Sequence, residues 1–208
     1  MEENKKEKKK GKKKHWLILA GAVCFAAMIV FQKEESMMVG TPTLTIETPQ
    51  KLSASATEEW ELDVSISDLG DVLYPAASMS IHFDSSCLEF LGIREGNVFV
   101  LGETNGAGMA RQLPEWSCNP EQCNKSGIIN LMYLDLTGGK HAFSQELLAE
   151  ENNVLVRLRF RLRGSVRSGD VYDLIVEDAV FAALDEKESL ATMNGTLKTK
   201  NGRVVIGE

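Results

Sequence analysis

The sequence has few of the residues from which catalytic and metal sites are built. Its 208 residues include three histidines, His15, His82 and His141, and four cysteines. A structural zinc site needs four ligands, which these residues do not supply at a suitable spacing. No Ser-His-Asp order or paired-carboxylate motif stands out, and the glycines of LGETNGAG, residues 101–108, lack the spacing and following helix of a phosphate-binding loop. We therefore expect that the protein is not an enzyme and that it binds no metal ion or cofactor.

Long hydrophobic runs are also rare, and the only clear one is WLILAGAVCFAAMIVF at residues 16–31. Residues 1–15 before it hold eight Lys and three Glu, whereas the whole chain has a formal net charge of -7, so the remainder is strongly acidic and nucleic acid is not an expected partner. As a helix the run spans ~24 Å against the usual ~30 Å, a deficit that snorkelling of Lys14 and Lys33 can absorb. The lysines predict a single-pass membrane anchor with a cytoplasmic N-terminus.

Two other fates are open for this segment, namely cleavage as a signal peptide and lipid attachment at Cys24. No small-x-small cleavage pattern precedes Gln32, and Val23 is a poor fit to the small residue that lipid attachment requires, so we favour the uncleaved anchor. Residues 32–42 lack periodicity and are expected to form a linker. Residues 43–208 then form one extracytoplasmic domain.

The domain is dominated by apolar residues at a period of two, which is typical of half-buried strands. In residues 60–67 the even positions are apolar and the odd positions are polar, including Glu61 and Asp63. In residues 153–163 Val156, Leu158, Phe160 and Leu162 alternate with four arginines. The arginines could bind an anion, but opposite charges on a neighbouring antiparallel strand explain them better, so we expect a cross-strand charge ladder.

Further strands are expected at residues 44–47, 76–83, 88–93, 128–136, 172–176, 180–183 and 203–206. Asn201-Gly202 favours a two-residue hairpin turn before the last of them. Helix evidence is limited to residues 143–151, where Ser144 could cap a turn. Many short strands separated by turn residues predict an all-β sandwich or barrel.

Cys118 and Cys123 lie in the segment PEWSCNPEQCNKSG, which is expected to be a loop. Outside the membrane, with four residues between them, a small loop-closing disulfide is the favoured interpretation. Free thiols and a metal site are the alternatives.

The stretch FDSSCLEFLGI, residues 83–93, predicts a tight turn at Asp84 that leads directly into an apolar strand. Together with the following Arg94-Glu95-Gly96 it resembles a signature of cohesin domains, the receptor modules that hold dockerin-bearing proteins in cellulosomes and on cell surfaces. GIINLMYLDLTGG (127–139), VFAALDEKESL (180–190) and NGRVVI (201–206) resemble later cohesin strands in the same order. The similarity covers roughly residues 42–207.

The resemblance implies a nine-stranded jelly-roll β-sandwich, an architecture shared with carbohydrate-binding modules, after the N-terminal transmembrane helix. It also implies that a dockerin binds one sheet face and that any calcium belongs to the dockerin. Where type I cohesins carry a paired Asn and Asp, this chain has Ala76 and Ser78, which suggests a more apolar partner surface or a partner unlike the usual dockerin. The partner-binding residues carried over are Ala76, Ser78, Ser80, His82, Asn130, Met132, Leu134, Asp135, Leu184 and Glu188.

The segment 128–136 is apolar on both of its faces. Ile129, Leu131 and Tyr133 alternate with a second set that includes Met132 and Leu134. A partner surface explains the second set, and a strand buried on both sides is the alternative.

Three functions follow from these patterns. The first is a membrane-anchored cohesin-like receptor that docks a secreted protein carrying a dockerin, such as a polysaccharide-degrading enzyme. The second is a carbohydrate-binding module, for which three Trp and three Tyr leave Trp116 as the one obvious sugar-stacking platform. The third is a hydrolase or structural envelope protein whose site the sequence does not reveal.

Overall fold

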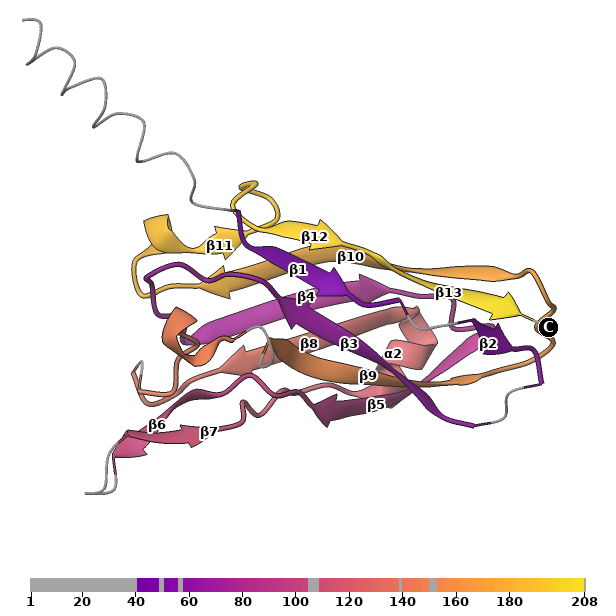
Figure 1. The fold of residues 1–208 in the computed structure, drawn as a ribbon, viewed down its shortest axis with the longest axis horizontal. Helices are drawn as coiled ribbons and strands as arrows, with labels where there is room; N and C mark the ends of the chain where they lie inside the picture. Colours follow the sequence, from indigo (N-terminus) through magenta and orange to yellow (C-terminus); the bar gives the residue numbers. More distant parts are fainter. Residues whose placement is uncertain are drawn as a thin grey trace, which may run out of the picture. The chain divides into compact units, whose positions relative to one another are not determined.

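The computed structural model describes residues 41–48, 51–55, 58–104, 109–138, 140–149 and 153–207 (Figure 1). They belong to one compact unit, Thr41–Glu208. The predicted tail 1–15, the anchor 16–31 and nearly all of the linker 32–42 lie outside the described residues. Within the part of the chain that is described, no helix is long and apolar enough to cross a membrane.

Two main sheets face each other, as predicted for an all-β sandwich. The first sheet has the strand order β12-β1-β3-β9-β5, and the second has the order β2-β13-β10-β4-β8, with β11 paired to β10. The first contains β1 (Thr43–Ile46), β3 (Trp60–Ile66), β5 (Leu88–Glu95), β9 (Val154–Leu162) and β12 (Lys198–Lys200). The second contains β2 (Leu52–Ser53), β4 (Ala76–His82), β8 (Ile128–Leu134), β10 (Val171–Ala182), β11 (Leu190–Ala191) and β13 (Gly202–Gly207).

A separate two-stranded ribbon consists of β6 (Val100–Thr104) and β7 (Met109–Gln112), neither of which is among the strands expected from the sequence. The described residues thus form thirteen strands, some of only two or three residues, so the predicted number of nine is not confirmed.

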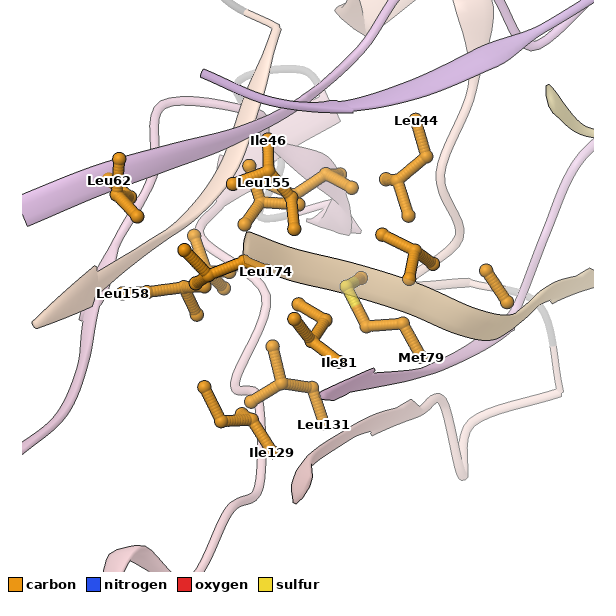
Figure 2. Close-up of a cluster of buried hydrophobic side chains, with 14 of the residues drawn as sticks. Leu44, Ile46, Leu62, Met79, Ile81, Ile129, Leu131, Leu155, Leu158 and Leu174 are labelled. Atoms are coloured by element: carbon orange, nitrogen blue, oxygen red, sulfur yellow. The ribbon is translucent and has the colours of Figure 1, made fainter. Parts of the chain in front are cut away.

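The core lies between the two sheets because each strand turns every second side chain inward. Ile81 on β4, Ile129 on β8 and Leu174 on β10 meet Leu62 and Leu158 of the first sheet, and all are almost completely buried (Figure 2). Each such side chain stabilises the fold by about 1.5–3 kcal/mol through removal of apolar surface from water.

The outer face of the first sheet carries the predicted charge ladder. Asp63 lies opposite Arg157 in the register of β3 and β9, and their charged atoms are 3.2 Å apart. The ladder continues through the pairs Arg159–Glu59, Arg94–Glu61 and Arg161–Glu89. Because these pairs are partly exposed, each contributes about 0–1 kcal/mol, but together they neutralise most of the arginine row without an anionic ligand.

The corner at residues 83–88 forms as the sequence predicts. The Asp84 carboxylate accepts hydrogen bonds from Ser86 N–H (2.9 Å) and from the Ser86 hydroxyl (2.5 Å), and the Asp84 carbonyl accepts one from Leu88 N–H (2.8 Å). The hydrogen bond from the Ser86 hydroxyl is the main cause that lowers the pKa of Asp84. The turn carries the chain from β4 of the second sheet to β5 of the first.

The segment around the two cysteines is a helix rather than the expected loop. Helix α2 (Pro120–Ser126) begins after Asn119, whose side chain accepts a hydrogen bond from Gln122 N–H (3.2 Å). Cys118 and Cys123 occupy the positions just before the cap and in the second helical turn, where two apolar residues often pack together. Both are free thiols in the structure, so the disulfide predicted between them is not formed.

Asn124 connects α2 to β5 at a bulge between Phe90 and Gly92. Its side chain accepts a hydrogen bond from Phe90 N–H (2.9 Å) and donates to the carbonyls of Phe90 (2.7 Å) and Pro120 (2.9 Å). β5 is the edge strand of the first sheet, so the Asn124 side chain satisfies backbone groups of Phe90 that have no neighbouring strand to bond.

The hairpin predicted at Asn201-Gly202 is wrong, because β12 and β13 belong to different sheets. Gly202 is required for another reason: a Cβ there would lie 2.5 Å from a methyl carbon of Ile46. The Asn201 side chain accepts a hydrogen bond from Val176 N–H (3.0 Å) at a bulge in β10. That bulge also explains why β10 was predicted as two strands.

Where a helix is expected in residues 143–151, the described part, residues 143–149, forms a single 3-10 turn, η1 (Gln145–Leu147). Ser144 caps it as predicted, since its hydroxyl accepts a hydrogen bond from Glu146 N–H (3.3 Å).

Candidate interaction face

The outer face of β10, β4 and β8 gathers most of the predicted site residues in rows across the three strands. Met132 and Val180 flank Ser78 in one row, and Leu134 and Ala182 flank Ala76 in the next. We call these six residues the apolar half of the face. The adjoining polar half consists of Ser80, His82, Asn130, Glu177 and Asp178.

The apolar half is open to solvent. Met132 is 55% exposed and Leu134 is 54% exposed, although β8 buries Ile129, Leu131 and Tyr133 on its other side. The chain's own described residues therefore do not cover this set, and the two-sided core strand considered from the sequence is not what forms. Exposed large apolar side chains that share one sheet face are typical of interaction surfaces.

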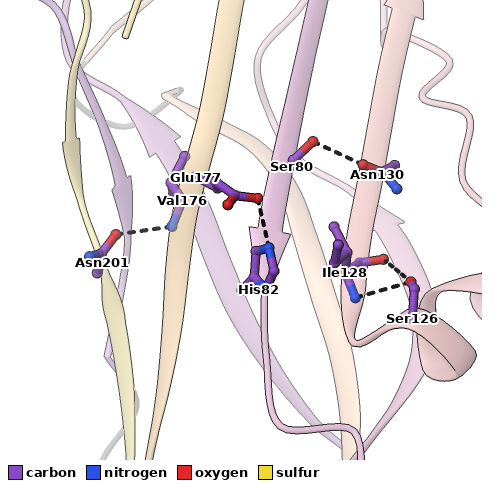
Figure 3. Close-up of polar contacts among 8 residues, drawn as sticks. All are labelled: Ser80, His82, Ser126, Ile128, Asn130, Val176, Glu177 and Asn201. Carbon is purple, nitrogen blue, oxygen red and sulfur yellow. Dashed lines mark hydrogen bonds and ion pairs between the residues drawn. The ribbon is translucent and has the colours of Figure 1, made fainter. Parts of the chain in front are cut away.

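The polar half is tied together by its own side chains (Figure 3). The Ser80 hydroxyl donates a hydrogen bond to Asn130 Oδ1 (2.9 Å), and His82 Nε2 lies 2.6 Å from Glu177 Oε2. Because these groups already bond to one another, a partner would gain less from them than from the apolar half.

The floor of the apolar half is hollowed, since the central strand β4 carries only small side chains there. A hollow of ≈ 160 Å³ is lined by residues of all three strands, among them Ala76, Ser78, Met132, Leu134 and Val180. A wider one of ≈ 530 Å³ follows it along β8 and reaches Ser117, Cys118 and Asn119.

The free edge of β8 is closed at two points. Ser117 exchanges backbone hydrogen bonds with Met132 (2.8 and 3.2 Å), and the Ser126 hydroxyl accepts one from Ile128 N–H (3.2 Å; Figure 3). These contacts obstruct the addition of another strand along this edge. A partner must therefore use the face of the sheet.

Acidic side chains lie on two sides of the apolar half. Directly beyond the end of β10, the exposed Leu184 (72%) precedes the 3-10 turn η2 (Glu186–Glu188), which Asp185 caps. On the β8 side, burial and then the charges of Asp135 and Glu115 raise the pKa of Tyr133 to about 12. On the other side, burial and then the charges of Glu188 and Asp68 raise the pKa of Tyr74. Both tyrosines thus lie close enough to carboxylates for the negative charge to raise their pKa values.

The structure brings together Ala76, Ser78, Met132 and Leu134 as the sequence predicts. Asp135 is half-buried, and its carboxylate holds the following loop by accepting hydrogen bonds from Thr137 N–H (2.7 Å) and His141 N–H (3.1 Å). It therefore shapes the end of β8, whichever partner binds.

Remaining site residues lie next to the apolar half. Ser80, His82 and Asn130 fall in the polar half, while Leu184 and Glu188 lie beyond the end of β10. Val180 and Ala182, which complete the hollow from β10, are not among the residues predicted from the sequence. Their outward positions follow only from the register with β4, which the bulge in β10 shifts.

Trp116 is not the open platform that the carbohydrate hypothesis needs. It is half-buried, with its ring 5.9 Å from that of Tyr133 and 5.8 Å from that of Phe143. Among the described residues, no group of three or more His, Cys, Asp and Glu side chains is placed to hold a metal ion.

No protein-family model and no curated protein matches this chain. Its fold, however, matches solved cohesin modules across most of its length. The third cohesin of ScaC from Acetivibrio cellulolyticus, solved in complex with the ScaB dockerin, is 12% identical at a TM-score of 0.56, covering 80% of this chain and 99% of that one.

Two further matches are cohesins from other organisms. A type III cohesin from the cell-surface anchoring scaffoldin ScaE of Ruminococcus flavefaciens is 14% identical, with a TM-score of 0.55 over 81% of this chain and 88% of that one. A non-cellulosomal cohesin from Archaeoglobus fulgidus is 12% identical, with a TM-score of 0.51 over 81% and 93%. The chain thus has the fold of cohesin modules.

Proposed function

We propose that this protein is a membrane-anchored, cohesin-like receptor that docks a dockerin-bearing secreted protein on the outer face of β10, β4 and β8. The observation that carries the proposal is the exposure of Met132 and Leu134 on a strand whose other side is core. A docking interface of ordinary size needs about 800 Å² from each partner and an apolar centre, which a face of this kind can supply.

Membrane attachment rests on the sequence, through the polybasic residues 1–15 and the apolar run 16–31. A dockerin-bearing partner is supported by several structural neighbours that are cohesins in complex with dockerins. We propose a polysaccharide-degrading enzyme as the carrier of the dockerin because the cohesin-like segments of the sequence suggest a cellulosome-type assembly. Catalysis forms no part of the proposal. Calcium would be carried by the partner, whose loops in the dockerin family resemble EF-hands.

Direct binding of glycan is the second function that the sequence suggested. A sugar-binding face usually offers exposed aromatic rings for stacking, and Trp116 is engaged with two aromatic neighbours instead. We therefore favour a protein partner.

The proposal is tested by capture from culture supernatant with residues 41–208, which contain the whole described core. We expect recovery of a protein that is released when calcium is chelated, and loss of that protein with Leu134→Asp. Val171→Asp is the matched control, because Val171 is similarly exposed (50%) at the far end of β10. Retention of the domain on insoluble polysaccharide, without any captured protein, would contradict the proposal.

A further inference from the structure

The hollow in the apolar half indicates what kind of side chain a partner presents. Ala76 and Ser78 form its floor, while Met132 and Leu134 stand on one side and Val180 on the other. Its volume of ≈ 160 Å³ is close to the ~150 Å³ of an apolar cavity that holds a benzene molecule. One large aliphatic or aromatic side chain can fill it.

The surroundings of the hollow indicate the charge of the partner. Glu115, Asp185, Glu186 and Glu188 are all exposed, and we call these four residues the acidic rim. Lys187 lies among them, so the negative charge is only partly balanced. The acidic rim lies on two sides of the apolar half, because Glu115 comes two residues before Ser117, which pairs with Met132, and residues 185–188 follow shortly after Ala182, which pairs with Ala76.

We propose that the partner is a cationic surface that inserts one large apolar side chain between Ala76, Ser78 and Leu134 and places Lys or Arg side chains against the acidic rim. This inference rests on the proposed function and adds the chemistry of the partner. Complementary charge at a rim mainly accelerates association, while the buried apolar contact slows dissociation.

The face is the route of entry because the edge of β8 is closed by Ser117 and Ser126. A partner that adds a strand there would first have to break the Ser117–Met132 hydrogen bonds. A partner helix that lies across the hollow can present apolar side chains at three- and four-residue spacing without contacting the edge of β8.

The test uses two conformationally stapled helical peptides with the same Leu and Phe stripe, one flanked by Lys and the other by Glu. Binding to residues 41–208 is followed by NMR shifts of the backbone amides. We expect the Lys peptide to bind at least about 5-fold more tightly at low salt, with shifts centred on the apolar half, and the preference to fade in ~0.5 M salt.

Two variants separate charge from shape. Glu186→Lys combined with Glu188→Lys should reduce or reverse the preference between the peptides, whereas Glu95→Lys on the first sheet should leave it unchanged. Ser78→Leu fills the hollow and should lower the affinity for both peptides by about 10-fold. Thr45→Leu, on the outer face of the first sheet, should leave the affinity for both peptides unchanged.

The inference is overturned if neither peptide binds, if the Glu peptide binds equally well, or if filling the hollow has no effect. Calcium-dependent capture of a secreted protein would still stand in that case. Loss of capture, in contrast, would remove the proposed function whatever the peptides do.

Discussion

Substitutions of Leu134 test whether this residue belongs to a partner interface or to the core. Leu134 is 54% exposed, so about half of its apolar surface remains for a partner to bury. Complete burial of a leucine side chain is worth about 1.5–3 kcal/mol, and the remaining half is therefore worth about 1 kcal/mol. Leu134→Ala should weaken partner binding about 5-fold, because 1.4 kcal/mol corresponds to a factor of ten.

Leu134→Asp should cost more, since it also places a carboxylate in a desolvated apolar contact near an acidic rim. We expect a loss of at least ~3 kcal/mol, or more than about 100-fold in Kd, measured by calorimetry with the captured partner.

The free domain should hardly respond to the same substitution. An exposed position changes the free energy of unfolding by about 0.5 kcal/mol, which corresponds to a Tm shift of about 2 °C for a chain of this size. A fall in Tm of more than about 6 °C, or unchanged affinity, would refute the reasoning.

Three further predictions concern the framework. Asn124→Ala should lower the free energy of unfolding by about 2–3 kcal/mol in urea denaturation, because it leaves both backbone groups of Phe90 without their partner; a change below ~0.5 kcal/mol would contradict this. Gly96→Ala should cost more than ~3 kcal/mol or prevent folding, since its Cβ would lie 1.9 Å from the carbonyl oxygen of Val154; normal stability would show that the two strands can separate there. Asp84 has a lowered pKa in the folded state, so its stabilising effect is present above about pH 4 and is lost as the pH falls further. Asp84→Asn should therefore flatten the acid limb of the stability profile measured by thermal melts, and an unchanged limb would speak against the turn as its source.

The sequence predicts the strands with strong period-two patterns because burial on one side of a sheet imposes that pattern. This holds for β3, β4, β8 and β9, and the charge ladder follows from the opposite signs on β3 and β9. The exposure of Met132 and Leu134 could be anticipated for the same reason, since apolar residues occur where the alternation calls for polar ones.

The features that the sequence did not predict depend on contacts between distant segments. β2, β11 and β12 are two or three residues long and exist only through the strands beside them. Gly202 resembles a turn residue, but the methyl group that requires a glycine there belongs to Ile46 of the other sheet.

Helix α2 is different, because its signals are present in the sequence itself. Asn119 at the cap, Pro120 at the first helical position and Gln122 two residues later form a typical helix start. This helix start places Cys118 just before the cap and Cys123 in the second helical turn, instead of both in a loop.

The central claim is that another protein covers the apolar half of the face. The most direct measurement is methyl cross-saturation NMR on residues 41–208 bound to the calcium-dependent protein captured from the supernatant. We predict the strongest intensity losses at the methyl groups of Met132, Leu134 and Ala76, with Val171 unaffected. Losses centred on the first sheet, with Met132 and Leu134 unchanged, would contradict the account.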